Sequence, residues 1–462
     1  MPLNWEAKRV LVLGAGVTGN AVAKSLSSFG ALIDLVDENT HANSVFPILN
    51  VGNIKITDYD AVVVSPGWKS DHPLILAAMA NGITIDNEID IAWRISQKIS
   101  PNQKWLALTG TNGKTTTVEM AAAMLQHAGL NAVACGNVGD TVIDAVTHKD
   151  AFDFLILELS SFQLHWMREA SFISAAILNI ADDHLDWHGS FENYCDAKFS
   201  ILDRADLAIL NAEDVEIVQR AKIFRGPKTF FSLGTPAPGE LGVVEDLLVD
   251  RAFVSDQQEA SMIATLKDIQ PTLPHSVLNA LAAAALARSV NVSYADIQSA
   301  LINFHPGQHR IETIKSIHGV SWIDDSKATN PHAASASLLS HLSVVWVAGG
   351  LAKGADMNSL IERTHGRIKA AILIGQDREL IASALMRVAP SIPIVKIDVD
   401  HDKTDKSNSL MESVVKAAQE FAAAGDTVLL APACASMDQF ISYADRGDRF
   451  AAAVRKLVPD EE

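Results

Sequence analysis

The segment that most constrains this chain is a short glycine-rich loop that follows an apolar run. Residues Trp105–Thr109 are typical of a buried strand, and Gly110-Thr111-Asn112-Gly113-Lys114-Thr115-Thr116 comes directly after them. In such a loop the backbone amides wrap a triphosphate, Lys114 neutralises its outer phosphates, and the Thr115 hydroxyl reaches Mg²⁺. Leu108 replaces the glycine that usually opens this motif, but strand, loop, lysine, threonine and helix occur in the required order. The loop predicts an α/β domain that binds phosphates.

Short β-branched runs alternate with alanine-rich helical stretches along the chain, which is typical of βαβ units with mainly parallel sheets. The 462 residues suggest roughly three domains. Polar stretches at Gln97–Gln103 and Asn303–Gln308 are candidate linkers. We predict a three-domain α/β fold: a Rossmann-like domain at 1–99, a central P-loop ATPase-like domain at 100–303 and a Rossmann-like C-terminal domain at 304–462. Within the central domain, Pro227–Leu273 is expected to be a small β-rich excursion, because its pattern is weak and it is rich in glycine and proline.

A second glycine motif, Gly14-Ala15-Gly16-Val17-Thr18-Gly19, follows the apolar run Val10–Leu13, and Asp37 ends the next strand-like run. This spacing is the dinucleotide-fold fingerprint, in which a diphosphate approaches a helix N-terminus. A NAD-dependent oxidoreductase and a protein that binds a UDP-sugar would use the same geometry. A close-packed turn without any ligand is the third interpretation.

Two further polar positions follow apolar runs in the central part. Glu158 comes after Phe154–Leu157, where a carboxylate could bind Mg²⁺ or merely cap the next turn. The cluster Asp182-Asp183-His184-Leu185-Asp186-Trp187-His188 resembles an active-site loop. A zinc site is disfavoured there because a third or fourth ligand at ordinary spacing is missing, and solvation of the acids explains most of the cluster equally well.

In the last third, four polar segments each lie beside a strand-like run: His309-Arg310-Ile311-Glu312, Asp324-Asp325-Ser326-Lys327-Ala328-Thr329-Asn330-Pro331, Gly349-Gly350-Leu351-Ala352-Lys353 and Pro432-Ala433-Cys434-Ala435-Ser436. Each one alone is best explained as a solvated turn. Together with a phosphate loop they favour a second substrate bound between domains.

Charge and cysteine content exclude several classes of protein. With 37 basic and 55 acidic side chains the net charge is −18, which disfavours nucleic acid as a partner. The three cysteines are unpaired in spacing, so we expect neither a disulfide framework nor a cysteine zinc site. The first six residues lack the pattern of an export signal, and no apolar run is long enough to span a membrane. We expect a cytoplasmic protein without membrane or nucleic-acid partners.

The loop Gly110–Thr115, the segments Leu157–Leu164 and Asp325–Asn330, and Pro432–Phe440 together resemble the Mur ligases of peptidoglycan synthesis. The last two segments are similar to those of the D-glutamate-adding members. The resemblance implies an ATP- and Mg²⁺-dependent amide ligase whose substrates are UDP-N-acetylmuramoyl-L-alanine and D-glutamate. It also implies a mechanism: the substrate carboxylate attacks the γ-phosphate of ATP, and the amine of D-glutamate displaces phosphate from the resulting acyl phosphate. We expect a monomer.

The resemblance carries roles onto individual positions. Those implied to be catalytic are Lys114, His184 and Lys198, the last as a carbamylated lysine. The magnesium ligands would be Thr115, Glu158, His184 and Lys198. The implied ATP-binding residues are Gly110, Thr111, Asn112, Gly113, Lys114, Thr115, Thr116, Asn279, Arg310 and Asp325. The UDP-substrate would contact Thr18, Asp37, Ser65, Gly67, Asn137, Ser160 and Gln163, and D-glutamate would contact Lys327, Thr329, Lys353, Ser436 and Phe440.

The chain departs from the family pattern at two places. His275-Ser276 stands where relatives usually have His-Asn, so no adenine contact is assigned to Ser276, and Glu38-Asn39 follows Asp37 where some relatives have Thr-Arg. Three alternatives stay open. They are another Mur ligase or a folylpolyglutamate synthetase, a NAD(P)-dependent oxidoreductase, and a nucleotide-binding switch that hydrolyses ATP slowly.

Overall fold

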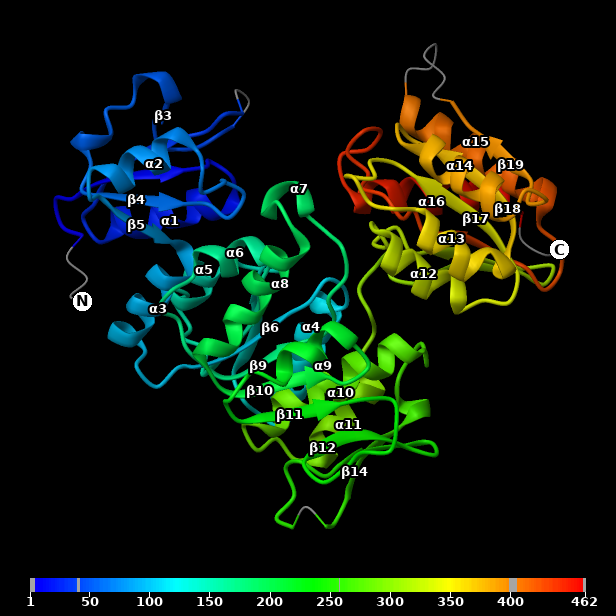
Figure 1. Ribbon diagram of the computed structural model, residues 1–462, viewed down its shortest axis with the longest axis horizontal. Coiled ribbons are helices and arrows are strands. Elements are labelled where there is room, and N and C mark those ends of the chain that lie inside the picture. Colours follow the sequence, from blue (N-terminus) through cyan, green and yellow to red (C-terminus); the bar gives the residue numbers. More distant parts are fainter. Residues whose placement is uncertain (1–4, 40–41, 257, 399–404, 460–462) are drawn as a thin grey trace. The chain divides into compact units, whose positions relative to one another are not determined.

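The computed structural model describes residues 5–39, 42–256, 258–398 and 405–459 (Figure 1). The N-terminal residues Met1 to Asn4, which enter the argument about an export signal, lie outside the described part. Tertiary contacts group the chain into two compact units: residues up to Ile180 with Ser190–Phe304, and Ala181–Gly189 with the residues from His305 onward. Among the described residues, no helix is both long and apolar enough to cross a membrane.

The first unit begins with a five-stranded parallel sheet of order β3-β2-β1-β4-β5. Its strands are β1 (Arg9–Leu13), β2 (Leu32–Val36), β3 (Ile48–Leu49), β4 (Ala61–Val64) and β5 (Thr84–Asn87). Its helices are α1 (Val17–Ser28), α2 (Pro73–Ala80) and α3 (Glu88–Ile99). The near-continuous apolar strands β1 and β4 are buried on both faces, as expected for central strands.

The larger sheet of this unit has nine strands in the order β14-β13-β12-β11-β10-β9-β6-β8-β7. They are β6 (Lys104–Thr109), β7 (Ala132–Gly136), β8 (Phe154–Glu158), β9 (Phe172–Ile177), β10 (Ala205–Asn211), β11 (Lys228–Phe231), β12 (Glu240–Val244), β13 (Leu247–Asp250) and β14 (Ser261–Thr265). The strands from β6 to β12 are parallel to one another, and β13 runs antiparallel to both of its neighbours, β12 and β14. The β-rich excursion expected at Pro227–Leu273 is confirmed, since β11 to β14 lie within it.

Seven helices accompany the nine-stranded sheet in the described part of this unit: α4 (Lys114–His127), α5 (Val142–Val146), α6 (Ser161–Trp166), α8 (Phe191–Phe199), α9 (Val215–Ala221), α10 (Pro274–Arg288) and α11 (Tyr294–Asn303). The alanine-rich α10 is buried over most of its length and packs on α4, which places it beside the phosphate loop. The predicted linker Gln97–Gln103 is partly wrong, because α3 continues to Ile99. The helix ends at Ile99, and Ser100, the residue before Pro101, is not helical, because a helical conformation is disfavoured at that position.

The second unit is built on a six-stranded sheet of order β15-β16-β20-β17-β18-β19, parallel except for β15. Its strands are β15 (Glu312–Ile317), β16 (Val320–Asp324), β17 (Val344–Gly349), β18 (Ile368–Ile374), β19 (Ile394–Lys396) and β20 (Thr427–Leu430). Its helices are α7 (Leu185–His188), α12 (Pro331–Leu339), α13 (Asn358–Thr364), α14 (Arg378–Val388), α15 (Lys406–Phe421) and α16 (Tyr443–Leu457).

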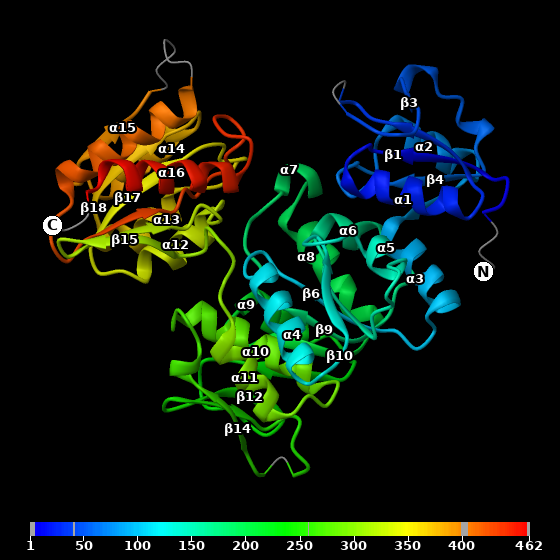
Figure 2. The same ribbon diagram turned by 180° about the vertical axis from the view of Figure 1, so that it is seen from behind.

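Both faces of this sheet are covered. Along β17, Val344 and Trp346 pack with residues of α12, α13 and α14, whereas Val345 and Val347 pack with residues of α15 and α16. Successive side chains of a strand point to opposite faces, so the uninterrupted apolar run serves two cores. Figure 2 shows α16 lying across the sheet. The two mostly parallel sheets with flanking helices and the central phosphate-loop domain confirm the predicted α/β fold class.

Candidate active site

The phosphate loop joins the end of β6 to the start of α4. Gly113 adopts a φ of +81°, and a Cβ at this position would lie 2.5 Å from Asn279 Oδ1 of α10. Only glycine therefore fits the turn. The Lys114 ammonium donates hydrogen bonds to the carbonyl oxygens of Gly110 (3.0 Å) and Thr111 (2.9 Å). A lysine on a loop at a helix N-terminus is suited to bind phosphate oxygens.

A buried carboxylate lies on the strand next to the loop. Glu158 ends β8, opposite Leu108 in the register with β6, and its side chain is 1% exposed. Asn137 Nδ2 donates to one carboxylate oxygen at 2.8 Å. Among the described residues, the other oxygen, Oε2, has no hydrogen-bond partner. Because a buried acceptor without a donor is costly, this oxygen fits a cation such as Mg²⁺.

Lys198 is held directly under the phosphate loop. This α8 residue is 2% exposed, and its ammonium donates to Gly110 O at 2.8 Å and lies 3.4 Å from Thr109 Oγ1. It also stands 4.8 Å from the ring centroid of Tyr194, whose hydroxyl is 2.8 Å from Thr111 Oγ1. The ammonium groups of Lys114 and Lys198 therefore both donate to the carbonyl oxygen of Gly110. Carbamylation of Lys198 stays a prediction.

His184 precedes α7 with a φ of +54°, and its Nε2 lies 3.6 Å from Asp183 Oδ2. The segment Ala181–Gly189 groups with the second unit. The structure thus brings Lys114, Glu158 and Lys198 to one loop, whereas the role of His184 at the same metal stays a prediction.

The first glycine motif forms a tight strand–helix turn. Gly14 has a φ of +102°, and a Cβ there would lie 2.7 Å from Ser65 Oγ, which is buried and has no partner among the described residues. Asp37 accepts the backbone N–H of Ala15 at 2.6 Å and of Asn39 at 2.7 Å. The carboxylate of Asp37 therefore braces the turn itself. Thr18 is half-buried and Gly67 is exposed at the same sheet edge. The contacts of both residues with the UDP-substrate stay predictions.

The remaining residues predicted to meet the UDP-substrate already have structural partners. Ser160 and Gln163 form the capping box of α6, with Gln163 N donating to Ser160 Oγ at 3.2 Å and Ser160 N to Gln163 Oε1 at 2.9 Å. Asn137 orients Glu158. These contacts fix the local geometry, and the proposed contacts with substrate remain untested.

In the second unit, the predicted ATP and D-glutamate residues cluster at the carboxyl ends of neighbouring strands. Asp325 follows β16 and is buried, and desolvation raises the pKa of its carboxyl group to about 7 in spite of the nearby Arg310. Lys327 and Thr329 lie on the same loop, Lys353 follows β17, and the buried Ser436 follows β20.

Two aromatic residues near this edge differ in their surroundings. Phe440, predicted to contact D-glutamate, is 7% exposed and packs in the core beside β20. Tyr443, which the sequence reasoning did not single out, carries the Lys327 ammonium 4.0 Å from its ring centroid. Nothing in the linear pattern distinguishes Tyr443 from an ordinary first residue of a helix.

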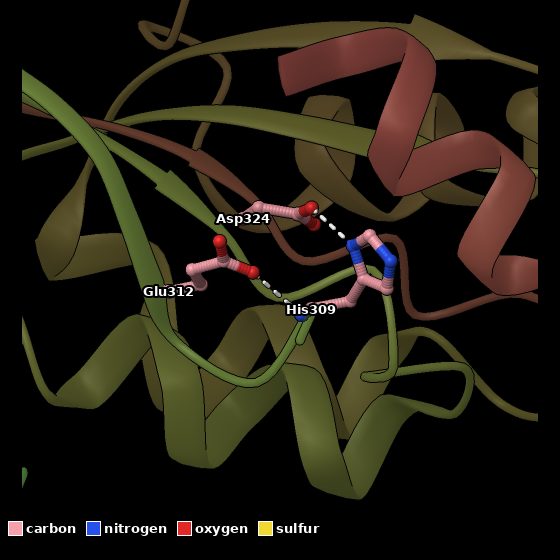
Figure 3. A group of neighbouring side chains, drawn as sticks. All are labelled: His309, Glu312 and Asp324. Carbon is pink, nitrogen blue, oxygen red and sulfur yellow. Dashed lines mark hydrogen bonds and ion pairs between the residues drawn. The ribbon is translucent and has the colours of Figure 1, made fainter. Parts of the chain in front are cut away.

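The sequence reasoning also left His309, Glu312 and Asp324 without individual roles. Their side chains converge beside α16, as Figure 3 shows. His309 Nδ1 lies 2.7 Å from Asp324 Oδ2, and Glu312 Oε2 accepts the backbone N–H of His309 at 2.9 Å. The hydrogen bond to Asp324 raises the pKa of His309. The three groups have the chemistry of metal ligands, but each already accepts or donates a hydrogen bond within the cluster. These hydrogen bonds hold the segment that carries Arg310 against β16.

Comparisons with known proteins agree with this geometry. The family model of the Mur ligase middle domain matches residues 108–287, and that of the Mur ligase glutamate ligase domain matches residues 309–434. The chain is 45% identical to the UDP-N-acetylmuramoylalanine–D-glutamate ligase of Streptomyces coelicolor, over 99% of this chain and 100% of that protein. It is also 45% identical to the ligase of the same name from Thermobifida fusca, with the same coverage of both.

Solved structures show the same fold at low sequence identity. The UDP-N-acetylmuramate-alanine ligase MurC of Thermotoga maritima superposes with a TM-score of 0.58 at 19% identity, covering 97% of this chain and 99% of that one. A pseudomurein peptide ligase type C of Methanothermus fervidus gives a TM-score of 0.60 at 17% identity, covering 97% and 100%.

The fold, the phosphate loop and these matches define the class of the protein as an ATP-dependent amide ligase. Within that class, the chain belongs to the Mur ligase family.

Proposed function

We propose that the protein adds D-glutamate to UDP-N-acetylmuramoyl-L-alanine at the expense of ATP, a step of peptidoglycan synthesis. The names of full-length relatives at 44–45% identity support this choice of substrates. The observation that carries the chemistry is the phosphate loop with Lys114 on it and the unpaired Glu158 oxygen on the adjacent strand. The oxidoreductase alternative gains no support from these features. The phosphate loop alone would also suit the nucleotide-binding switch, and the relatives favour the ligase over it.

A carboxylate is a poor acyl donor until one of its oxygens becomes part of a phosphate leaving group. The proposed first step forms a bond between a carboxylate oxygen of the UDP-substrate and the γ-phosphorus, and ADP leaves. In the second step the amine of D-glutamate attacks the acyl carbon, inorganic phosphate leaves, and the amine loses a proton. Such transfer depends mainly on positioning and on neutralising phosphate charge.

The chain's own residues would supply that neutralisation. Lys114 would exchange the carbonyl oxygens of Gly110 and Thr111 for phosphate oxygens, because a flexible ammonium can reorient at low cost. Glu158 and Thr115 would hold Mg²⁺, which lends the phosphates a positive counter-charge when bound. Lys198, if carbamylated, would turn from a cation into an anionic ligand beside them.

The remaining assignments form one proposal about three domains at 1–99, 100–303 and 304–462. The first binds UDP through Thr18, Asp37, Ser65 and Gly67, with Asn137, Ser160 and Gln163 of the second facing the same substrate. ATP lies on Gly110–Thr116 with Asn279, Arg310 and Asp325. D-glutamate meets Lys327, Thr329, Lys353, Ser436 and Phe440, and His184 completes the metal site. The monomeric state and the cytoplasmic location are part of this proposal.

The test measures ADP and phosphate release with ATP, Mg²⁺ and UDP-N-acetylmuramoyl-L-alanine, in the presence of D-glutamate, L-glutamate or no amino acid. Mass detection follows the UDP-substrate. Release that requires D-glutamate, with the matching mass gain, is the expected result. Turnover with a different amine would move the chain to another substrate within the family. ATP hydrolysis that ignores every amine would refute the ligase.

A further inference from the structure

Arg446 of α16 is a fully buried arginine, 0% exposed, whose guanidinium donates to residues at or just after the ends of strands. Its Nε and Nη2 donate to Ser326 Oγ and Ser326 O, both at 2.9 Å. Its Nη1 lies 3.1 Å from Cys434 O and 3.5 Å from Gly349 O. All four acceptors are a neutral hydroxyl or carbonyl oxygens. Burial lowers the pKa of Arg446 to about 10, so the group is still charged at neutral pH.

The three segments that Arg446 contacts lie at the carboxyl ends of three neighbouring strands. In the sheet, β16, β20 and β17 are adjacent and parallel, so their carboxyl ends lie at the same edge. Ser326 follows β16, Gly349 ends β17, and Cys434 lies after β20. One planar guanidinium therefore forms hydrogen bonds with all three segments at this edge of the sheet.

Close packing fixes where the guanidinium lies. A Cβ on Gly447, the next residue of α16, would come within 2.2 Å of His309 Nδ1 and 2.6 Å of Asp324 Oδ2. The helix thus rests directly on the His309–Asp324 pair. Ser326 Oγ also donates to Tyr443 O at 2.7 Å, which ties the first turn of α16 to the loop after β16.

We propose that Arg446 is a positioning residue for D-glutamate: its fork of hydrogen bonds to Ser326, Gly349 and Cys434 sets the relative places of the loops that carry Lys327, Lys353 and Ser436. This inference rests on the proposed function. It assigns Arg446 no contact with substrate. Its N–H groups hold the backbone of three segments whose side chains must converge on one small molecule. A guanidinium suits this role better than an ammonium, because its donors lie in one rigid plane.

The test uses the full-length protein with four single substitutions: Arg446→Lys, Arg446→Met, Ser326→Ala and the control Arg449→Met. Arg449 lies on the same helix but pairs with Asp445 and Asp405, away from the three loops. For each variant we would measure KM for D-glutamate, KM for the UDP-substrate, KM for ATP, kcat and the melting temperature. Hydrogen exchange of the segments 324–330, 349–353 and 432–440 is measured in parallel.

Arg446→Lys should raise KM for D-glutamate about tenfold or more, which corresponds to about 1.4 kcal/mol, while KM for the UDP-substrate stays within about twofold. Ser326→Ala should shift KM in the same direction, and exchange should quicken in all three segments. The Arg449→Met control should show neither effect. A variant that merely loses stability would lower the melting temperature without this selective change in KM.

Folded Arg446 variants with an unchanged KM for D-glutamate would overturn the inference. If both Arg446 variants fail to fold, Ser326→Ala decides in the same way. A wild-type protein that does not ligate D-glutamate would refute the proposed function instead. Hydrogen exchange would then test the role of Arg446 without substrate: unchanged protection of the three segments in Arg446→Lys or Ser326→Ala would reject that role.

Discussion

Glu158→Gln should raise the stability of the ligand-free protein while it removes nucleotide-dependent stabilisation. In the free protein, Glu158 is 1% exposed, and one carboxylate oxygen has no hydrogen-bond donor among the described residues. Leaving a buried polar group unsatisfied costs about 1–3 kcal/mol. Glutamine keeps the oxygen that accepts from Asn137 and replaces the unpartnered charged oxygen with a neutral amide group, so the gain comes from removing a buried charge. Since 1 kcal/mol shifts the melting temperature of a domain of this size by about 2–4 °C, we expect a rise of about 2–12 °C.

The same substitution should prevent Mg²⁺-ATP from stabilising the protein. A ligand at about 100 times its Kd stabilises the folded state by about 2.7 kcal/mol. Thermal unfolding with and without Mg²⁺-ATP therefore separates the two effects, with Asn137→Ala as a control that disturbs the orientation of Glu158 but keeps its charge. A Glu158→Gln protein that melts lower than wild type, or that Mg²⁺-ATP stabilises equally, would refute the assignment of the unpaired oxygen to a cation.

Three further predictions concern other residues of the first unit. Lys114→Ala should abolish ADP formation but leave binding of the UDP-substrate intact in calorimetry; loss of both would point to misfolding. Glu88 is buried and desolvation raises its pKa to about 7, so the folded state binds the proton more tightly and stability should fall from about pH 4.5 to about pH 7. In Glu88→Gln that slope, up to about 1.4 kcal/mol per pH unit, should disappear from urea unfolding curves. Asp90 accepts the backbone N–H groups of Arg168, Glu169 and Ala170 at 2.7, 2.8 and 3.0 Å, so Asp90→Ala should cost about 3–5 kcal/mol of unfolding free energy; a loss below 1 kcal/mol by the same assay would show that water replaces the carboxylate.

The sequence was sufficient for features that depend on local order along the chain. A strand, a glycine turn and a helix in succession predict a phosphate loop, because backbone geometry alone fixes where Lys114 begins its helix. The apolar run of β8 likewise predicts that Glu158 stands at a strand end. These features need no knowledge of which strands are neighbours.

Features that depend on which segments pack together could not be predicted. Arg446 reads as one more charged residue in an amphipathic helix, and only the adjacency of β16, β20 and β17 buries it. Phe440 and Tyr443 are equivalent in a linear pattern, but packing sends Phe440 into the core and leaves Tyr443 beside Lys327. Asp90 reads as an ordinary acid in the first turn of a helix, and its backbone partners lie about eighty positions away.

The phosphate loop combines both kinds of information. The carbonyl oxygen of Gly110 accepts hydrogen bonds from Lys114, which the motif predicts, and from Lys198, which arrives from α8. Two ammonium groups on one carbonyl repel each other, so the free loop holds its cations close together at an electrostatic cost. A triphosphate would relieve that cost by attracting Lys114 away from the carbonyl. With Lys198 unmodified, the loop gathers two ammonium groups around Gly110 O, so its local charge suits an anion such as phosphate.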